Sequence, residues 1–274
     1  MSTVKIAVLQ MTSGIDPEAN FRTISDAAVE AAKAGAEILF TPEMSLLLDR
    51  DRGRAAETMA DASYADYVER LKGLAQDADL EIAIGSMPIP LGDGRFANRT
   101  HYFDDGFNDP VTYDKIHMFD VELASGETWR ESSVYAPGKK IVSVDDSPLG
   151  TLGFTICYDV RFPAVFEALG NRRCNAIAVP AAFTVPTGKA HWHLMLRARA
   201  VEASAFVIAA AQVGSHEDGR ETYGHSLVVD PWGEVILDMG GEQPGLGFCD
   251  IDLSRIDEVR KQIPSLANRR EILT

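Results

Sequence analysis

The stretch GFTICYDVRFP, residues 153–163, places a cysteine between two kinds of secondary structure. Residues 150–155 read as an apolar strand, and the pair Phe162–Pro163 begins a helix. Cys157 therefore falls at a strand-to-helix turn, where backbone N–H groups are free to bind an oxyanion. The start of a helix also favours a thiolate. The position predicts a nucleophile rather than a cysteine that only packs in the core.

The same alternation of β-rich runs and helical patterns continues along most of the chain. The predicted strands are 4–10, 37–41, 81–86, 98–103, 110–118, 150–157, 175–181, 206–212, 225–230 and 245–251. The predicted helices are 18–34, 63–78, 163–170, 188–204 and 253–262. This alternation is typical of an α/β protein, and successive strands with short turns in the second half predict mixed sheets. No linker interrupts the chain, so we expect one domain over residues 1–274 with two packed sheets.

Composition and charge narrow the class of partner. The chain has 274 residues, of which 46% are hydrophobic and 24% charged, and a chain of this size can bury a core without disulfides or metals. Its net charge is −15 and its pI is about 4.8. Nucleic acid and membrane surfaces are therefore not expected as partners, because binding them needs a basic face. An anionic small molecule would need a local arginine or lysine.

The cysteines and the apolar runs predict a cytoplasmic protein. Cys157, Cys174 and Cys249 are widely spaced and form no CxxC pair, so neither a disulfide framework nor a zinc knuckle is expected. Free thiols fit a reducing compartment. The first residues, MSTVKIAVLQM, read as a strand rather than a signal peptide, and the longest apolar runs are too short for a spanning helix.

Three further polar residues could take part in chemistry. Glu43 follows the buried strand of ILFTPEMS, residues 38–45, at the carboxyl end where α/β sheets bind ligands. Lys115 lies in VTYDKIHMFD, residues 111–120, on one strand face with aromatic residues, and an inward lysine can stabilise a developing negative charge. Glu131 lies in the loop ETWRES. Taken singly, each position also fits a surface or edge residue.

Two other motifs do not predict a site. His191 and His193 flank Trp192 on a predicted helix, where residues two apart point to nearly opposite faces, so the pair is not expected to chelate a metal. The run GHSLV, residues 224–228, lacks the second glycine of the Gly-x-Ser-x-Gly elbow of serine hydrolases. The sequence therefore predicts neither a metal centre nor a serine nucleophile.

The order of the polar residues is more specific than any one of them. A Pro-Glu after a strand, then a strand lysine, a glutamate and Cys-Tyr-Asp-x-Arg-Phe-Pro resembles the nitrilase superfamily of carbon–nitrogen hydrolases. The likeness extends over about residues 4–273 and includes YDKIHMFDVE, CYDVRFP, GKAHWHLMLRARAVE, YGHSLVVDPWGEV and QIPSLANRRE. These phrases are similar to the amidase branch of that superfamily.

The resemblance implies a fold and an assembly. The implied fold is a four-layer α-β-β-α sandwich, and members pair into an eight-layer dimer. We therefore expect the helix 163–170 and the tail 261–274 to lie at the two-fold interface of a homodimer, with larger homo-oligomers left open. The chemistry of the family calls for no metal ion and no organic cofactor.

The resemblance also implies a role for each polar residue. The catalytic triad falls on Glu43, Lys115 and Cys157, with Glu131 as a helper. Glu43 is expected to act as the general base while Cys157 attacks an amide carbon, and the resulting thioester is then hydrolysed. Lys115 and the backbone N–H of Tyr158 are expected to hold the oxyanion. Glu131 is expected to keep Lys115 charged and aimed.

The substrate that the resemblance implies is the terminal amide of a small carboxylic acid, cleaved to the acid and ammonia. Deaminated glutathione, a 2-oxo acid, is the first expectation and 2-oxoglutaramate the second, followed by an N-carbamoyl amino acid or a nitrile. A catalytically silent binding protein of the same fold is the remaining alternative. Arg161, four residues after Cys157, is expected either to bind a substrate carboxylate or to pair with Asp159 or another buried carboxylate.

Overall fold

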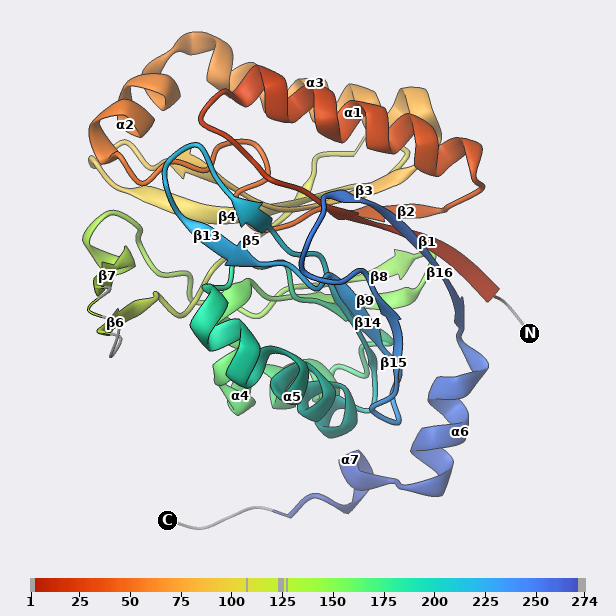
Figure 1. The fold of residues 1–274 in the computed structure, drawn as a ribbon. Coiled ribbons are helices and arrows are strands. Elements are labelled where there is room, and N and C mark those ends of the chain that lie inside the picture. The colour runs from red at the N-terminus through yellow and green to blue at the C-terminus, as the bar shows by residue number, and fades with distance from the viewer. Residues whose placement is uncertain (1–2, 107, 123–125, 127, 271–274) are drawn as a thin grey trace.

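Two six-stranded sheets form the centre of the computed structural model, which describes residues 3–106, 108–122, 126 and 128–270 (Figure 1). The first sheet has the order β16-β1-β2-β3-β4-β5, and the second has the order β15-β14-β11-β10-β9-β8. The strands of the first sheet are β1 (Thr3–Gln10), β2 (Ile38–Phe40), β3 (Glu81–Pro90), β4 (Phe96–Phe103), β5 (Val111–Asp114) and β16 (Gly245–Asp252). The strands of the second sheet are β8 (Ser143–Ser147), β9 (Gly150–Phe154), β10 (Ala176–Ala178), β11 (Phe206–Ala209), β14 (Leu227–Val229) and β15 (Val235–Asp238).

The two sheets follow the same plan. Three neighbouring strands run parallel in each, namely β1, β2 and β3 in the first sheet and β9, β10 and β11 in the second. One antiparallel strand extends each triplet on one side, β16 or β8. Two antiparallel strands extend it on the other side, β4 and β5 or β14 and β15. The predicted α/β class with mixed sheets is confirmed.

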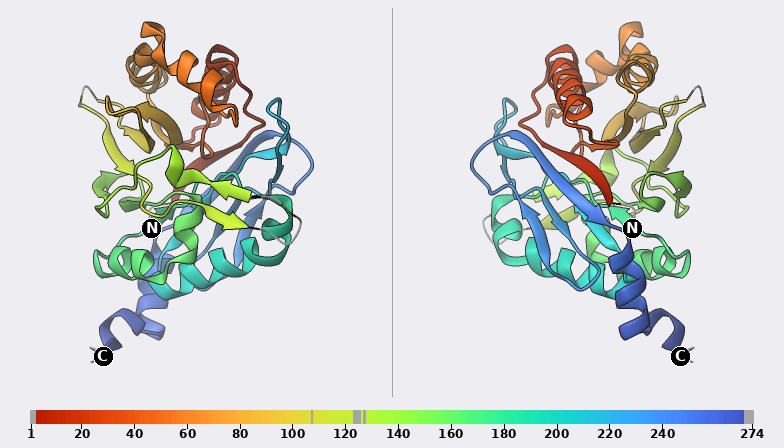
Figure 2. Two further views of the ribbon diagram at one scale, coloured as in Figure 1. Left: turned by 90° about the vertical axis from the view of Figure 1, so that its left-hand side faces the viewer. Right: turned by 90° about the vertical axis from the view of Figure 1, so that its right-hand side faces the viewer.

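Helices flank both sheets (Figures 1 and 2). Those beside the first sheet are α1 (Pro17–Lys33), α2 (Arg52–Ala60) and α3 (Ala62–Ala78), and those beside the second are α4 (Pro163–Asn171) and α5 (Val185–Ala203). Two further helices, α6 (Ser254–Gln262) and α7 (Ser265–Asn268), lead the chain away from the sheets. Two short ribbons pair β6 (Asp120–Glu122) with β7 (Thr128–Arg130) and β12 (Val213–Ser215) with β13 (Glu221–Tyr223). Within the described ranges, none of the helices combines the length and the apolar character needed to cross a bilayer.

The sequence of α1 shows why a helix forms at this place. The side chain of Asp16 caps the helix by accepting a hydrogen bond from the N–H of Glu18, and Pro17 occupies the first turn, where no N–H is needed. Four buried residues follow with the spacing i, i+3, i+4 and i+7, and these are Ile24, Ala27, Ala28 and Ala31. This apolar stripe packs α1 against the first sheet.

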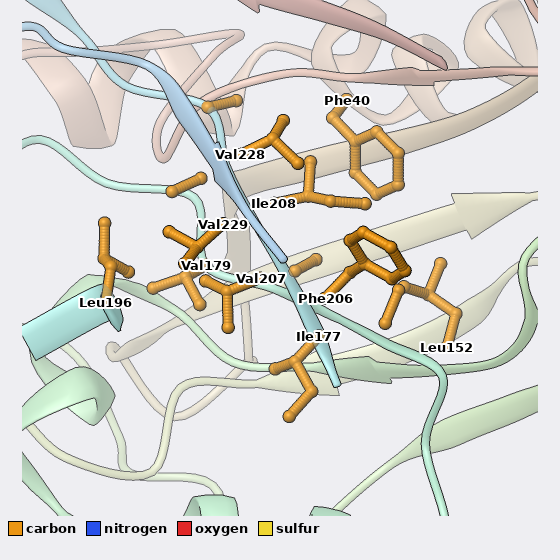
Figure 3. Close-up of a cluster of buried hydrophobic side chains, with 14 of the residues drawn as sticks. Phe40, Leu152, Ile177, Val179, Leu196, Phe206, Val207, Ile208, Val228 and Val229 are labelled. Atoms are coloured by element: carbon orange, nitrogen blue, oxygen red, sulfur yellow. The ribbon is translucent and has the colours of Figure 1, made fainter. Parts of the chain in front are cut away.

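The hydrophobic core has two parts. One cluster contains buried residues from both sheets and from α4 and α5, and Figure 3 shows Phe40 of β2 facing Ile208 of β11 across it. Leu196 of α5 belongs to the same cluster and is fully buried. The second cluster fills the space between the first sheet and the helices α1 and α3. Each fully buried large apolar side chain contributes roughly 1.5–3 kcal/mol to the stability of the fold. The first cluster, which contains residues of both sheets, therefore provides most of the energy that holds the sheets together.

The five predicted helices are present, and every predicted strand has a counterpart. Several predicted strands are shorter than expected, for example β5, which ends at Asp114, β9, which ends at Phe154, and β10, which covers only Ala176–Ala178. The structure also contains β8, β12, β13, β15 and α7, which were not predicted. The helix α2 was not predicted, because only Ala55 and Met59 of its nine residues are buried and they make no clear apolar pattern. The ribbon of β6 and β7 was missed for the same reason, since none of its described residues is buried.

Candidate active site

The four polar residues predicted from the sequence come together where strands end. Glu43 follows β2, and Lys115 follows β5 directly. Glu131 opens the 3-10 turn η1 (Glu131–Ser133) after β7, and Cys157 opens the 3-10 turn η2 (Cys157–Arg161) after β9. Because Glu43 and Lys115 come from the first sheet and Cys157 from the second, the cluster forms where the two sheets meet.

The Lys115 ammonium lies between two carboxylates. Its Nζ atom is 2.8 Å from Oε1 of Glu43, and 3.0 Å and 2.9 Å from Oε1 and Oε2 of Glu131. The side chain of Lys115 is 2% exposed and that of Glu43 is 6% exposed, so these charges are almost wholly removed from water. Burial alone would lower the pKa of Lys115, but the Glu131 and Glu43 carboxylates raise that pKa well above its ordinary value. The lysine therefore stays charged.

The Glu43 carboxylate is ionised because the Lys115 ammonium is next to it. Burial raises its pKa, but the Lys115 ammonium outweighs burial and leaves the pKa of Glu43 below its usual value. The N–H of Ala182 donates a hydrogen bond of 3.0 Å to Oε2 of this carboxylate. The Cys157 thiol lies close enough to this carboxylate for each group to shift the pKa of the other. A charged base therefore stands beside the thiol.

The Cys157 thiol holds its proton at neutral pH, which differs from the thiolate expected at a helix start. Burial raises its pKa well above the ordinary value, and the negative charge of Glu43 raises it further. No α-helix begins at Cys157, because residues 157–161 form η2 and α4 starts only at Pro163. The backbone of Cys157 has a φ of +48°, a left-handed conformation that residues other than glycine rarely adopt. Because burial keeps the thiol protonated, its activation depends on the neighbouring base.

Sequence reasoning missed one member of the cluster, Asn98. Its Nδ2 atom donates hydrogen bonds of 2.9 Å to Oε1 of Glu43 and 3.1 Å to Oε1 of Glu131. Its backbone carbonyl accepts a hydrogen bond of 2.9 Å from the N–H of Lys115. The side chain lies on β4 and is buried. A buried amide inside a strand was the available signal, because such a group needs partners.

A cavity of about 270 Å³ opens onto the cluster. Its lining includes Glu43, Lys115, Glu131, Cys157 and Tyr158, together with Arg50, Arg52, Arg130 and Arg220. The ring of Trp129 also lines the cavity, and the guanidinium carbons of Arg50 and Arg220 lie 5.6 Å and 5.4 Å from the ring centroid. The lining also includes Asp49 and Glu221, and Arg220 and Arg130 are paired with Asp218 and Glu122. The cavity therefore joins the polar cluster to an aromatic wall rich in guanidinium groups, which can contact an anionic ligand.

Arg161 is not among the residues that line this cavity. Its guanidinium nitrogens lie 3.4 Å from Nδ1 of His191, and its Cζ atom lies 5.7 Å from the ring centroid of Tyr158. Asp159, the suggested ion-pair partner, instead accepts a hydrogen bond of 2.6 Å from the hydroxyl of Tyr113. Arg161 therefore lies behind Tyr158 and Phe183, two residues of the cavity wall, and the structure shows no ion pair between it and Asp159 among the described residues.

Comparison with known protein families and proteins gives a consistent result. The family model described as carbon-nitrogen hydrolase matches residues 5–261. A deaminated glutathione amidase from a Synechocystis strain is 36% identical over 266 residues, which cover 96% of this chain and 97% of that protein. The human deaminated glutathione amidase is 35% identical over 271 residues, which cover 97% of this chain and 82% of that protein.

Solved structures show the same fold. The NitFhit protein of C. elegans superposes with a TM-score of 0.91 at 34% identity, and the match covers 98% of this chain and 66% of that one. An amidase from Nesterenkonia superposes with a TM-score of 0.81 at 27% identity, covering 97% of this chain and 94% of that one. In that structure, a mutant, the acetamide moiety of fluoroacetamide is covalently added to the active-site cysteine.

Proposed function

The chain belongs to the carbon–nitrogen hydrolase family, and we therefore propose that it is a thiol-dependent amidase with its active site in the cavity around Lys115. The observation that carries this proposal is the burial of one ammonium between two carboxylates beside a thiol. This arrangement provides a base, a nucleophile and a fixed positive charge for a developing oxyanion, which are the parts that hydrolysis of an amide through a thioester needs.

The first half of the reaction moves one proton between three groups. Glu43 takes the proton of the Cys157 thiol while the sulfur attacks the amide carbon. Lys115 then has the oxyanion as its negative neighbour in place of the neutralised Glu43, so the charge around the ammonium stays balanced. The backbone N–H of Tyr158 is the second proposed donor to the oxyanion. When the C–N bond breaks, Glu43 gives the proton to the leaving nitrogen, which departs as ammonia.

The second half of the reaction regenerates the thiol. Glu43 takes a proton from water, and the hydroxide attacks the thioester carbon at the same oxyanion position. When the C–S bond breaks, Glu43 returns the proton to the sulfur of Cys157. Glu131 takes no part in these proton transfers and remains in contact with the ammonium through both of its carboxylate oxygens. We assign Glu131 the role of holding Lys115 charged and aimed.

For the substrate, we propose the terminal amide of a small 2-oxo acid, with deaminated glutathione first and 2-oxoglutaramate second. The names of the similar proteins support the first choice, and the guanidinium groups in the wall of the cavity support an anionic substrate. A buried carboxylate without a cation is costly, so a cationic group should contact it. Arg50 and Arg220 are the proposed cations, because both line the cavity beside Trp129.

Ammonia release from four substrate types tests the activity. We expect turnover to be fastest with deaminated glutathione, slower with 2-oxoglutaramate, and poor with an uncharged aliphatic amide or a nitrile. The Cys157→Ala variant is the control for contaminating activity. A preference for the nitrile, or carbon dioxide release from an N-carbamoyl amino acid, would replace the amidase assignment. No release from any of these compounds would favour the catalytically silent protein.

Three arginine variants locate the group that recognises the carboxylate. Arg50→Ala and Arg220→Ala should each lower kcat/KM for the acidic substrates at least tenfold while leaving the neutral amide nearly unchanged, as expected for the loss of a charge-assisted hydrogen bond. Arg161→Ala is the comparison, since Arg161 contacts His191 and lies behind the cavity-lining rings of Tyr158 and Phe183. A selective loss only in Arg161→Ala would return carboxylate recognition to Arg161.

We also propose that the single domain is a four-layer α-β-β-α sandwich and that it forms a cytoplasmic homodimer. Exposed apolar side chains on α5 and on the β14–β15 hairpin support pairing, and these are Leu194, Val201, Trp232, Val235 and Ile236. A hydrogen bond of 2.7 Å from Arg197 to the carbonyl of Gly233 joins the helix to the hairpin as one surface. The expected interface includes 163–170 and 261–270, while 271–274 lie outside the described residues. Light scattering that gives a monomer at micromolar concentration would contradict the dimer.

A further inference from the structure

Three side chains from distant parts of the chain converge outside the catalytic cavity. His193 lies on α5, His225 lies just before β14, and Asp238 ends β15. Nε2 of His193 is 2.9 Å from Oδ2 of Asp238, and Nδ1 of His225 is 2.9 Å from Oδ1 and 3.2 Å from Oδ2 of the same carboxylate. All three potential ligand atoms lie within 4.8 Å of one another. None of the three residues lines the catalytic cavity.

The spacing of these atoms fits a small metal ion. In a tetrahedral zinc site the bonds are about 2.0–2.1 Å long, which places neighbouring ligand atoms about 3.3 Å apart. The two distances from Oδ2 of Asp238 to the ring nitrogens, 2.9 Å and 3.2 Å, are close to that ligand-to-ligand distance. Two imidazoles and one carboxylate are also ligand types that Zn²⁺ accepts. An ion could enter with only small side-chain adjustments.

Neighbouring groups hold the ligands in place before any ion arrives. The ring of His225 stacks on Tyr223 with the centroids 4.4 Å apart, and its backbone has a φ of +56°. Its carbonyl accepts a hydrogen bond of 2.8 Å from Nε1 of Trp192, the residue before His193. The N–H of Gly240 donates a 2.9 Å hydrogen bond to Oδ1 of Asp238. Such supporting contacts orient metal ligands and strengthen binding.

The charge and exposure of the cluster also suit a cation. The Asp238 carboxylate lies within hydrogen-bond distance of both imidazoles and of the Gly240 N–H, and it is the anionic ligand among the three. The side chains of His193, His225 and Asp238 are 35%, 25% and 32% exposed, so solvent can reach the centre. Water can therefore supply the remaining coordination position.

We propose that His193, His225 and Asp238 form a binding site for a divalent transition-metal ion of the Zn²⁺ type, which ties α5 to the β14–β15 hairpin. Coordination requires the ring nitrogen that faces Asp238 in each imidazole to be free of its proton, so the tautomer that binds the metal carries its N–H on the nitrogen that faces away from the ion. The pair His191–His193 does not chelate, because His191 contacts Arg161. His193 instead finds its partners on other elements, which sequence spacing could not reveal.

Cobalt binding to protein freed of any affinity tag tests the site, because Co²⁺ substitutes for Zn²⁺ and has visible absorption bands. We expect one Co²⁺ per chain, displaced by Zn²⁺, with band intensities of a four- or five-coordinate ion. Asp238→Asn, which keeps the size of the side chain, should weaken binding at least tenfold, and His193→Ala should do the same. His191→Ala, on the same helix, should bind like the unchanged protein.

The melting temperature gives a second measure. Zn²⁺ should raise it in the unchanged protein and in His191→Ala, and leave it unchanged in Asp238→Asn and His193→Ala, because only an ion bound to the folded state stabilises it. The proposal would be overturned if no cobalt bound at micromolar protein, or if Asp238→Asn and His193→Ala bound cobalt as well as the unchanged protein. It would also be overturned by a sulfur-to-cobalt charge-transfer band that disappears in Cys157→Ala, because that result would place the ion at the catalytic thiol.

Discussion

Asn98 and Lys115 donate hydrogen bonds to the same two oxygens, Oε1 of Glu43 and Oε1 of Glu131. The ammonium supplies the charge that lowers the pKa of Glu43, and the amide fixes the distance between the two carboxylates. Because the amide carries no charge, it can hold the carboxylates together without competing with Lys115 for a proton. Asn98 is therefore a positioning residue whose loss should be visible in the pH dependence of the reaction.

Asn98→Ala should lower kcat about ten- to a hundredfold, which is the effect of a lost hydrogen bond to a charged group. The hydrogen bond from Asn98 lowers the pKa of Glu43, so its removal raises that pKa. Turnover needs ionised Glu43, and the acid limb of the kcat/KM profile should therefore move to higher pH. The measurement is a pH–rate profile of both proteins. An unshifted acid limb would mean that Asn98 only supports the fold.

Cys157 should be the first cysteine to react with iodoacetamide. Mass spectrometry of the labelled peptides measures the order in which the cysteines react. Cys174 is fully buried, and burial raises the pKa of Cys174 and of Cys249 to about 11. Cys157 faces the cavity and has a base beside its thiol. Earlier labelling of Cys249 would argue against Cys157 as the nucleophile, as would turnover by a clean Cys157→Ala preparation.

Glu43→Gln should separate alkylation from turnover. Without a base, the proton cannot reach the leaving nitrogen, so ammonia release should be abolished. The negative charge of Glu43 raises the pKa of Cys157, so its removal lowers that pKa and alkylation should persist, with its pH midpoint below that of the unchanged protein. Rates of alkylation against pH give the midpoint. Near-normal ammonia release would show that another group is the base.

Lys115→Ala should lower kcat by at least ~10²–10³-fold, as loss of an oxyanion donor does. It should also destabilise the fold by about 3–5 kcal/mol, because the buried Glu43 and the partly buried Glu131 lose their only close cation among the described residues. Adding Glu131→Gln to this variant should recover part of the stability and none of the activity. Glu131→Gln alone should lower the rate strongly with a smaller change in stability. Urea denaturation measures the stability of each variant, and ammonia release measures its activity. If adding Glu131→Gln to Lys115→Ala left the stability unchanged, unpaired carboxylate charge would not be the cause of the destabilisation.

Glu81 should make stability depend on pH. Burial raises its pKa from 4.5 to about 7 in the folded protein. Between these values the folded state binds a proton that the unfolded chain has lost, so this group's contribution to stability falls as pH rises from about 4.5 to about 7. Glu81→Gln should remove this pH-dependent loss of stability, which amounts to at most about 3 kcal/mol over the whole range. Urea denaturation at about pH 5 and about pH 8 measures it, with the exposed Glu37→Gln as control, and equal slopes in all three proteins would contradict the prediction.

The sequence predicted the alternating elements because their apolar patterns are strong, as in α1, where buried residues recur with helical spacing. It failed at α2 and at the β6–β7 ribbon, where few residues are buried and the pattern is weak. The polar cluster of Glu43, Lys115 and Cys157 was predicted from the order of short motifs. That order was informative through its resemblance to a known family, because the local pattern alone placed Lys115 within the predicted strand 110–118 and not at the end of one.

Interactions between distant segments were harder to predict. Asn98 carries no motif of its own, and only the fold shows that it lies between two carboxylates. The position of Arg161, four residues after Cys157, suggested the substrate, but η2 turns its side chain toward His191. The state of the Cys157 thiol depends on its burial and on Glu43, which lies on another sheet. Each of these features is set by tertiary contacts that no local pattern records.

The shared plan of the two sheets has a consequence for how activity appears during synthesis. The segment that emerges first carries the base, the lysine and the helper carboxylate, but the nucleophile belongs to β9 and its following turn in the second sheet. The first sheet is itself completed only by β16, the last strand of the chain, which pairs with β1 after the whole second sheet has been synthesised. A chain paused before β9 holds the base without its nucleophile, and we expect ammonia release only once both sheets are complete, so activity reports the completion of folding.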